Sequence, residues 1–128
     1  MKLLLDTHVF LWLNGAPEKL SDMARQACEN PENHLYLSVA SAWEIQIKQQ
    51  LGKLQLEVSW QDMVKTQQRE NGLAISPVEL VHVEALATLP AVHRDPFDRI
   101  IISQAILDGM TIVTVDAVFS SYPVRVVG

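Results

Sequence analysis

The sequence alternates short apolar runs with longer segments of helical periodicity, and this alternation constrains the fold more than any other feature. Apolar runs typical of buried strands cover residues 2–5, 35–39 and 111–115. Shorter strands are expected at residues 73–75 and 124–127. Strands that alternate with helices indicate βαβ units. We therefore expect an α/β fold with a central, mostly parallel sheet of about four to five strands flanked by helices.

Helices are expected between these strands because local start and stop signals frame each segment. Gly15 and Pro17 stop a helix that is expected at residues 8–14. The strongest helical pattern runs from Pro96 to Asp108, and Gly109 is expected to end it. The other expected helices cover residues 21–29, 42–51, 59–71 and 78–89.

Size and composition favour one globular domain in the cytoplasm. The 128 residues fit a single domain, which typically has about 100–150 residues. The only cysteine, Cys28, cannot form an internal disulfide. The apolar start of the chain is interrupted by Asp6 and His8 before a signal-peptide core is complete, and no apolar run approaches the roughly 20 residues of a membrane span. No membrane contact is expected.

The net charge of −5 speaks against a simple nucleic-acid binder, which normally presents a basic surface. An acidic protein can nevertheless act on phosphates when bound cations reverse the local field at its site. The positions of the acidic residues therefore matter more than their number.

Four carboxylates fall at junctions between expected strands and helices. Asp6 and Asp116 follow strands, while Glu44 and Asp98 open helices. In a parallel sheet these junctions share the carboxyl edge, where α/β proteins place their sites. The helix after Asp98 descends about 16 Å and the next strand climbs back about 16 Å, so Asp98 and Asp116 are expected at a similar height.

Each of these acids also has a purely structural interpretation. Residues 41–44 match a capping box, in which Glu44 would only bond back to the helix terminus. Residues 95–98 match a helix start with an acid in the first turn, and Asp116 is able to start a turn. Asp6 is the hardest to explain in this way, because an acid directly after an apolar strand risks costly burial.

Carboxylates gathered in one pocket repel each other unless a cation balances them. Ligation by oxygen alone favours Mg²⁺ or Mn²⁺ over zinc. Such an ion activates water and stabilises the charge that develops on a phosphate. We therefore expect Mg²⁺ or Mn²⁺ to be bound by the four junction acids, which are Asp6, Glu44, Asp98 and Asp116.

Four motifs in a fixed order resemble the PIN-domain family, and within it the VapC-type toxins of toxin–antitoxin pairs. The motifs are LLDT at residues 4–7, SAWEI at 41–45, DRIIISQA at 98–105 and VTVD at 113–116. The resemblance extends from the first residue to about residue 122 and implies that residues 1–128 form one Rossmann-like PIN domain. It further implies a Mg²⁺- or Mn²⁺-dependent endoribonuclease that hydrolyses RNA phosphodiesters, a cognate antitoxin and a homodimer.

The resemblance assigns roles to individual residues. The four junction acids match the family's acidic quartet, and Thr114 matches a hydroxyl residue that supports the ligands. Both Asp95 and Asp98 stand where one acid is needed; the helical pattern favours Asp98 and leaves Asp95 as a cap or auxiliary ligand. Arg94 and Arg99 flank this acid, so they are expected either to bind substrate phosphate or to pair with the neighbouring carboxylates.

For other residues near the acids we prefer a structural or solvent-exposed role over a functional one. His8 and His93 are candidates for ligands or proton carriers, but a hydrogen-bonded or solvated histidine is the more common case. Lys48 and Lys53 are expected on a solvated helix face, with an RNA-binding rim as the alternative. An apolar helix surface that involves Trp12 or residues 59–71 is a candidate for a dimer or antitoxin contact.

The main alternative function is a non-catalytic PIN-like interaction module that a partner regulates. Phosphate chemistry on another α/β fold fits less well. A haloacid-dehalogenase-like phosphatase needs a second Asp two residues after Asp6, where His8 stands, and a response-regulator receiver needs an Asp pair after the first strand.

Overall fold

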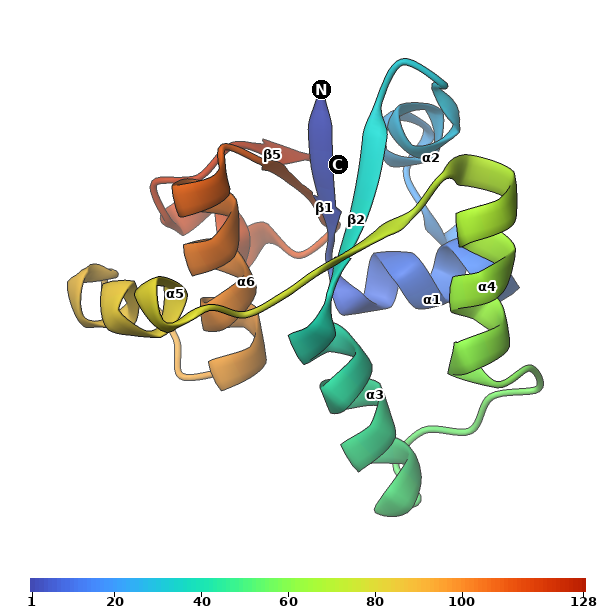
Figure 1. Ribbon diagram of the computed structural model, residues 1–128, viewed down its shortest axis with the longest axis horizontal. Helices are drawn as coiled ribbons and strands as arrows, with labels where there is room; N and C mark the ends of the chain where they lie inside the picture. Colours follow the sequence, from blue (N-terminus) through green and yellow to red (C-terminus); the bar gives the residue numbers. More distant parts are fainter.

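A central sheet whose strands are all parallel organises the chain (Figure 1). The computed structural model describes residues 1–128. The strands are β1 (Lys2–Leu5), β2 (His34–Ser38), β3 (Ala74–Ser76), β4 (Thr111–Val113) and β5 (Val126–Val127), in the spatial order β3-β2-β1-β4-β5. The helices are α1 (Thr7–Gly15), α2 (Asp22–Glu29), α3 (Val39–Gln50), α4 (Trp60–Asn71), α5 (Leu80–Glu84) and α6 (Pro96–Asp108). Short 3₁₀ helices are η1 (Pro17–Lys19), η2 (Ala85–Thr88) and η3 (Ala117–Ser121). The predicted α/β fold is confirmed.

β1 lies at the centre of the sheet and is buried on both faces. Leu3 and Leu5 point into a core that includes Phe10 of α1, while Leu4 points into a second core that includes Ile101 of α6. In Figure 1, α1, α2 and α4 lie on one side of β1 and β2, and α5 and α6 lie on the other. This double burial explains why the first strand is a continuous apolar run without alternation.

The strand order places a natural crevice beside the end of β1. The chain passes from β1 to β2 and β3 on one side and later returns to β4 on the other, so the order reverses between β1 and β4. Ligands of open parallel sheets bind outside the carboxyl ends of the strands at such a reversal. Asp6 directly follows β1, and α6 starts at the same end of the molecule (Figure 1).

The predicted capping box at residues 41–44 is wrong. α3 starts at Val39, directly after β2, and its N-cap is Ser38, whose Oγ accepts a hydrogen bond from the Ala40 backbone N–H at 3.0 Å. Ser41 therefore lies inside the helix and accepts a buried hydrogen bond from Thr7 Oγ1 at 2.9 Å. The structural explanation of Glu44 as part of a helix cap is thereby removed.

Other elements are also shorter than expected, among them β5, which begins at Val126 instead of residue 124. β4 ends at Val113 instead of residue 115, so Asp116 follows a turn rather than the strand itself. The helix expected at residues 78–89 is divided into α5 and η2. None of the helices combines the length and the apolarity that crossing a membrane requires.

Gly109 ends α6 in the left-handed conformation, with φ of +68°, and an added Cβ would meet no atom within 4 Å. Gly109→Ala is therefore expected to lower the free energy of unfolding by about 1–2 kcal/mol through the backbone alone. Gly15→Ala is the matched control, because Gly15 is helical with equally open space around it. Urea unfolding measures both variants, and an equal effect of the two substitutions would contradict the prediction.

Candidate active site

Asp6 is an ionisable side chain buried at the end of the central strand, with 4% of its surface exposed. Its Oδ2 accepts a hydrogen bond at 2.9 Å from Oγ1 of Thr114, which is equally buried. Burial raises the pKa of the Asp6 carboxyl to about 6; the Thr114 hydrogen bond opposes this shift and the negative charge of Asp98 adds to it. Thr114, which directly follows β4, thus contacts Asp6, while the supporting role that the resemblance implies for it stays a prediction.

Glu44 lies one turn into α3 and is also 4% exposed. Lys48, four residues later on the same helix, donates from Nζ to Glu44 Oε2 at 2.6 Å. This hydrogen bond is the main cause that raises the pKa of Lys48, and the charges of Asp95 and Asp98 act in the same direction. Lys48 was expected on a solvated helix face, but it instead forms a partly buried ion pair with Glu44 beside the other acids.

Asp98 projects from the first turn of α6 and is partly buried. Its Oδ2 lies 3.0 Å from His93 Nε2. Burial raises the pKa of the Asp98 carboxyl; the His93 hydrogen bond opposes the shift, and the charges of Asp95 and Glu44 add to it. Asp98 is therefore electrostatically linked to both other buried acids.

Asp95 is the N-cap of α6, because its Oδ1 accepts hydrogen bonds from the backbone N–H groups of Phe97 and Asp98 at 2.9 and 3.1 Å. The cap predicted from the sequence is confirmed. One oxygen of Asp95 is used to hold the helix terminus that carries Asp98. Which of the two acids binds metal stays a prediction.

Asp116 differs from the other three acids. It is exposed, and its Oδ1 accepts a hydrogen bond from the Val118 N–H at 3.0 Å, which starts η3. Its link to the site runs through its backbone N–H, which donates to Thr114 Oγ1 at 3.0 Å. The charge of Asp98 thus acts on Asp6, and the charge of Glu44 acts on Asp98, whereas Asp116 is not among the charges that shift their pKa values, so the ligand role of Asp116 stays a prediction.

The donor set fits a hard divalent cation in its chemistry. It consists of carboxylate oxygens supported by a hydroxyl, which is the ligand type that Mg²⁺ and Mn²⁺ prefer. As placed, no group of three or more Asp, Glu, His or Cys side chains is close enough to hold a metal ion. Lys48 and His93 instead supply the partners of Glu44 and Asp98.

The two arginines have different surroundings. Arg99 donates to the carbonyl oxygens of Pro90 and Leu86 and to the Tyr122 hydroxyl. Its guanidinium therefore links α6 to η2, to Pro90 and to Tyr122. Arg94 is exposed beside a cavity of about 460 Å³ that Arg99 also lines. Neither arginine pairs with a carboxylate, so the structural pairing considered from the sequence is not formed.

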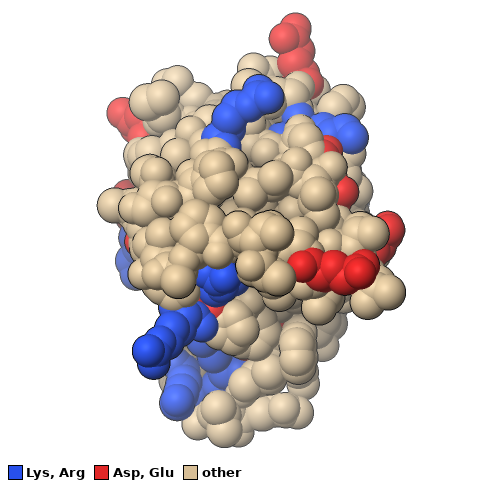
Figure 2. Space-filling model, turned by 90° about the vertical axis from the view of Figure 1, so that its left-hand side faces the viewer, with Lys and Arg blue, Asp and Glu red and all other residues tan.

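The surface charge is uneven although the protein is acidic overall. Figure 2 shows the face that bears α5 and α6, where basic side chains gather towards the lower end. β1 and β2 run towards this end in Figure 1. Cationic side chains near the carboxyl edge are compatible with a phosphate ligand.

Sequence reasoning missed two supporting side chains. Lys48 stands four residues after Glu44, a spacing that brings side chains together on a helix, so a signal was present. Tyr122 contacts His93 and Arg99, which are 29 and 23 residues away in the sequence, and no local sequence pattern predicts such a contact.

Two of the solved structures that are similar in fold are VapBC complexes. VapBC2 from Rickettsia felis, bound to a DNA fragment from their promoter, matches with a TM-score of 0.71 and 18% identity over 98% of this chain and 97% of that chain. DNA-bound VapBC from Salmonella typhimurium matches with a TM-score of 0.64 and 14% identity over 98% of this chain and 96% of that chain. Both show the fold.

The sequence comparisons identify the family. Ribonuclease VapC22 of Mycobacterium tuberculosis is 32% identical over 116 residues, which cover 88% of this chain and 85% of that protein. The model of the PIN domain family matches residues 3–124. The chain therefore belongs to the PIN domain family.

Proposed function

We propose that this protein is a divalent-metal-dependent endoribonuclease and the toxin of a toxin–antitoxin pair, acting in the cytoplasm as a single PIN domain. The observation that carries the proposal is the burial of Asp6 and Glu44 together with the position of the partly buried Asp98, whose carboxylate interacts electrostatically with both. Similarity to Ribonuclease VapC22 supports RNA as the substrate.

Asp6, Glu44, Asp98 and Asp116 would hold Mg²⁺ or Mn²⁺, directly or through water. When bound, the ion supplies Lewis-acid stabilisation of the phosphate and lowers the pKa of water that attacks it. Thr114 keeps the Asp6 carboxylate oriented through the 2.9 Å hydrogen bond. Asp95 supports the site by capping the helix that begins at Pro96.

Substrate phosphate would be bound at the edge of the site by cationic side chains. Arg94 is the stronger candidate, because it is exposed, whereas the donors of Arg99 are engaged with Pro90, Leu86 and Tyr122. Lys48 neutralises Glu44 and lies close enough to the acids for Asp95 and Asp98 to influence its pKa. A contribution of Lys48 to RNA binding would require its release from Glu44.

Apolar surfaces support protein partners. A cavity of about 480 Å³ lies between α3 and α6 and is lined almost entirely by hydrophobic residues. Trp43 in its wall is 63% exposed, and its ring packs edge-on against that of Phe97 with the ring centroids 5.4 Å apart. This surface suits the proposed homodimer. A second groove of about 460 Å³ includes Trp12 and Leu56. Similarity to VapBC supports an antitoxin as a partner, and this groove is our candidate for the contact.

Asp6→Asn is expected to reduce RNA cleavage by more than about 100-fold, because loss of a ligand should exceed the 10–100-fold cost of losing a supporting group. Cleavage of a panel of single-stranded and structured RNAs in the presence of Mn²⁺ measures the effect. Asp22→Asn is the matched control, because Asp22 is exposed on α2. Metal-independent partner binding without cleavage of any RNA would instead favour the non-catalytic module.

Asp6→Asn is also expected to stabilise the metal-free protein. Because the pKa of Asp6 rises from 3.8 to about 6 on folding, the folded state binds more protons, and stability falls as the pH rises through this interval. At pH 7 the loss is on the order of 3 kcal/mol, which the asparagine variant avoids. Urea unfolding without metal between pH 4 and pH 7 tests this. An equal pH dependence of wild type and variant would contradict the stated cause.

A further inference from the structure

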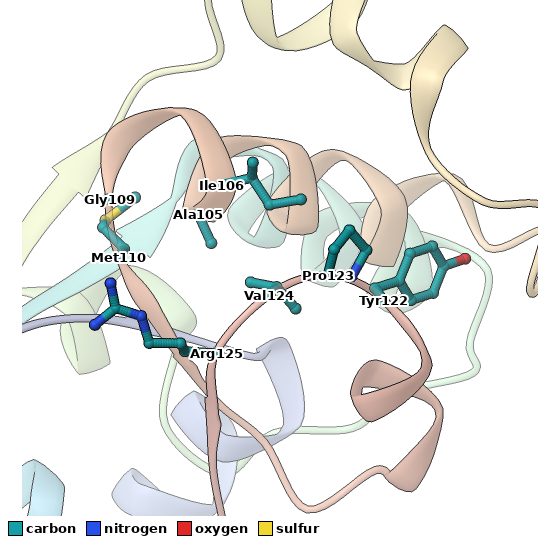
Figure 3. Close-up of a pocket in the computed structure, with 8 residues that line it drawn as sticks. All are labelled: Ala105, Ile106, Gly109, Met110, Tyr122, Pro123, Val124 and Arg125. Carbon is teal, nitrogen blue, oxygen red and sulfur yellow. The ribbon is translucent and has the colours of Figure 1, made fainter.

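The hydroxyl of Tyr122 joins three groups next to the proposed site. It lies 2.6 Å from His93 Nδ1, 3.3 Å from the His93 backbone nitrogen and 3.1 Å from Nη1 of Arg99. Tyr122 is 4% exposed, and its ring packs against the His93 ring with centroids 5.4 Å apart. Figure 3 shows the Tyr122 ring at one end of a pocket, with its hydroxyl pointing away from Val124 and Arg125. Both the ring and the hydroxyl of Tyr122 therefore contact His93.

The chemistry of the three contacts sets the direction of each hydrogen bond. A tyrosine hydroxyl has one hydrogen to donate and accepts at its oxygen. The Arg99 guanidinium and the His93 backbone N–H are obligate donors, so both donate to the oxygen. When the His93 imidazole is neutral, the hydroxyl hydrogen is therefore left for Nδ1, and the imidazole carries its own hydrogen on Nε2. From there it donates to Asp98 Oδ2 at 3.0 Å.

We propose that Tyr122, acting through His93, is a positioning residue for Asp98: it selects the Nε2–H tautomer of His93, which holds one oxygen of Asp98 and leaves the other for the metal. The proposal rests on the proposed function insofar as Asp98 is a metal ligand. Groups that orient the ligands of a metal commonly contribute 10–100-fold to its affinity.

Arg99 keeps the segment that carries His93 in place. Besides donating to Tyr122, it bonds the carbonyl oxygens of Pro90 at 2.8 Å and Leu86 at 3.4 Å. These contacts hold the chain between η2 and α6 against the first turn of α6. The tyrosine hydroxyl is thus fixed from one side by Arg99 and delivers its hydrogen to His93 on the other.

The tautomer of His93 tests the first step without any metal. In ¹⁵N-labelled, metal-free protein, above the pH range in which imidazole titrates, His93 is expected to be protonated on Nε2. Tyr122→Phe should shift a measurable fraction to the Nδ1–H tautomer. Tyr36→Phe is the matched control at the only other tyrosine and should leave His93 unchanged. A wild-type His93 with its hydrogen on Nδ1 would overturn the proposal.

Titration with Mn²⁺ alone tests the second step. Tyr122→Phe is expected to weaken Mn²⁺ binding by about tenfold and to regain RNA cleavage at saturating Mn²⁺. His93→Gln, which keeps a side-chain N–H, should bind Mn²⁺ more tightly than His93→Ala. A role in packing alone would lower the unfolding midpoint of Tyr122→Phe and leave its Mn²⁺ affinity unchanged, and this result would refute the positioning role.

The two proposals fail in different ways. If wild type binds Mn²⁺ and cleaves RNA while Tyr122→Phe matches Tyr36→Phe in tautomer and affinity, the positioning role is wrong and the nuclease stands. If wild type shows the Nε2–H tautomer but neither binds Mn²⁺ nor cleaves RNA, the nuclease is wrong, and the action of Tyr122 on a metal site is wrong with it.

Discussion

The hydrogen bond between Thr114 and Asp6 joins residues 108 positions apart, and the candidate site depends on it. Asp6 lies at the end of a strand buried on both faces, where a charged carboxylate loses most of its hydration. The hydroxyl of Thr114, the residue that follows the adjacent strand β4, partly compensates for this loss. The compensation is possible because the chain returns to β4 beside β1 after it has formed the other half of the sheet.

Each of the three acids has one side-chain partner: Thr114 for Asp6, Lys48 for Glu44 and His93 for Asp98. These partners do not remove the repulsion, because Asp98 still raises the pKa of Asp6 and Glu44 that of Asp98. Without a divalent cation, the arrangement costs folding stability. Such a cost is typical of sites in which function rather than packing determines the residue.

The elements of the fold could be predicted where the signals are local. Asp95, Pro96 and Gly109 frame α6, and its bounds were predicted correctly because capping chemistry acts within a few residues. The start of α3 was not, because Ser38 and Ser41 are both competent caps. The choice depends on where β2 stops pairing with β3, and Ser38 is its last paired residue, opposite Ser76. That pairing is a tertiary property.

The same distinction separates the acids from the groups that tune them. Parallel topology sends every strand–helix junction to one edge, so the placement of Asp6, Glu44 and Asp98 follows from their positions at junctions. Asp116 shows the limit of this rule, because β4 ends early and a turn leads the carboxylate outward. The positions of the side chains that hydrogen-bond to these acids follow from no such rule. Tyr122 reaches His93 because the segment after η3 packs against α6, and the path of such a segment is determined by the whole core rather than by neighbouring residues.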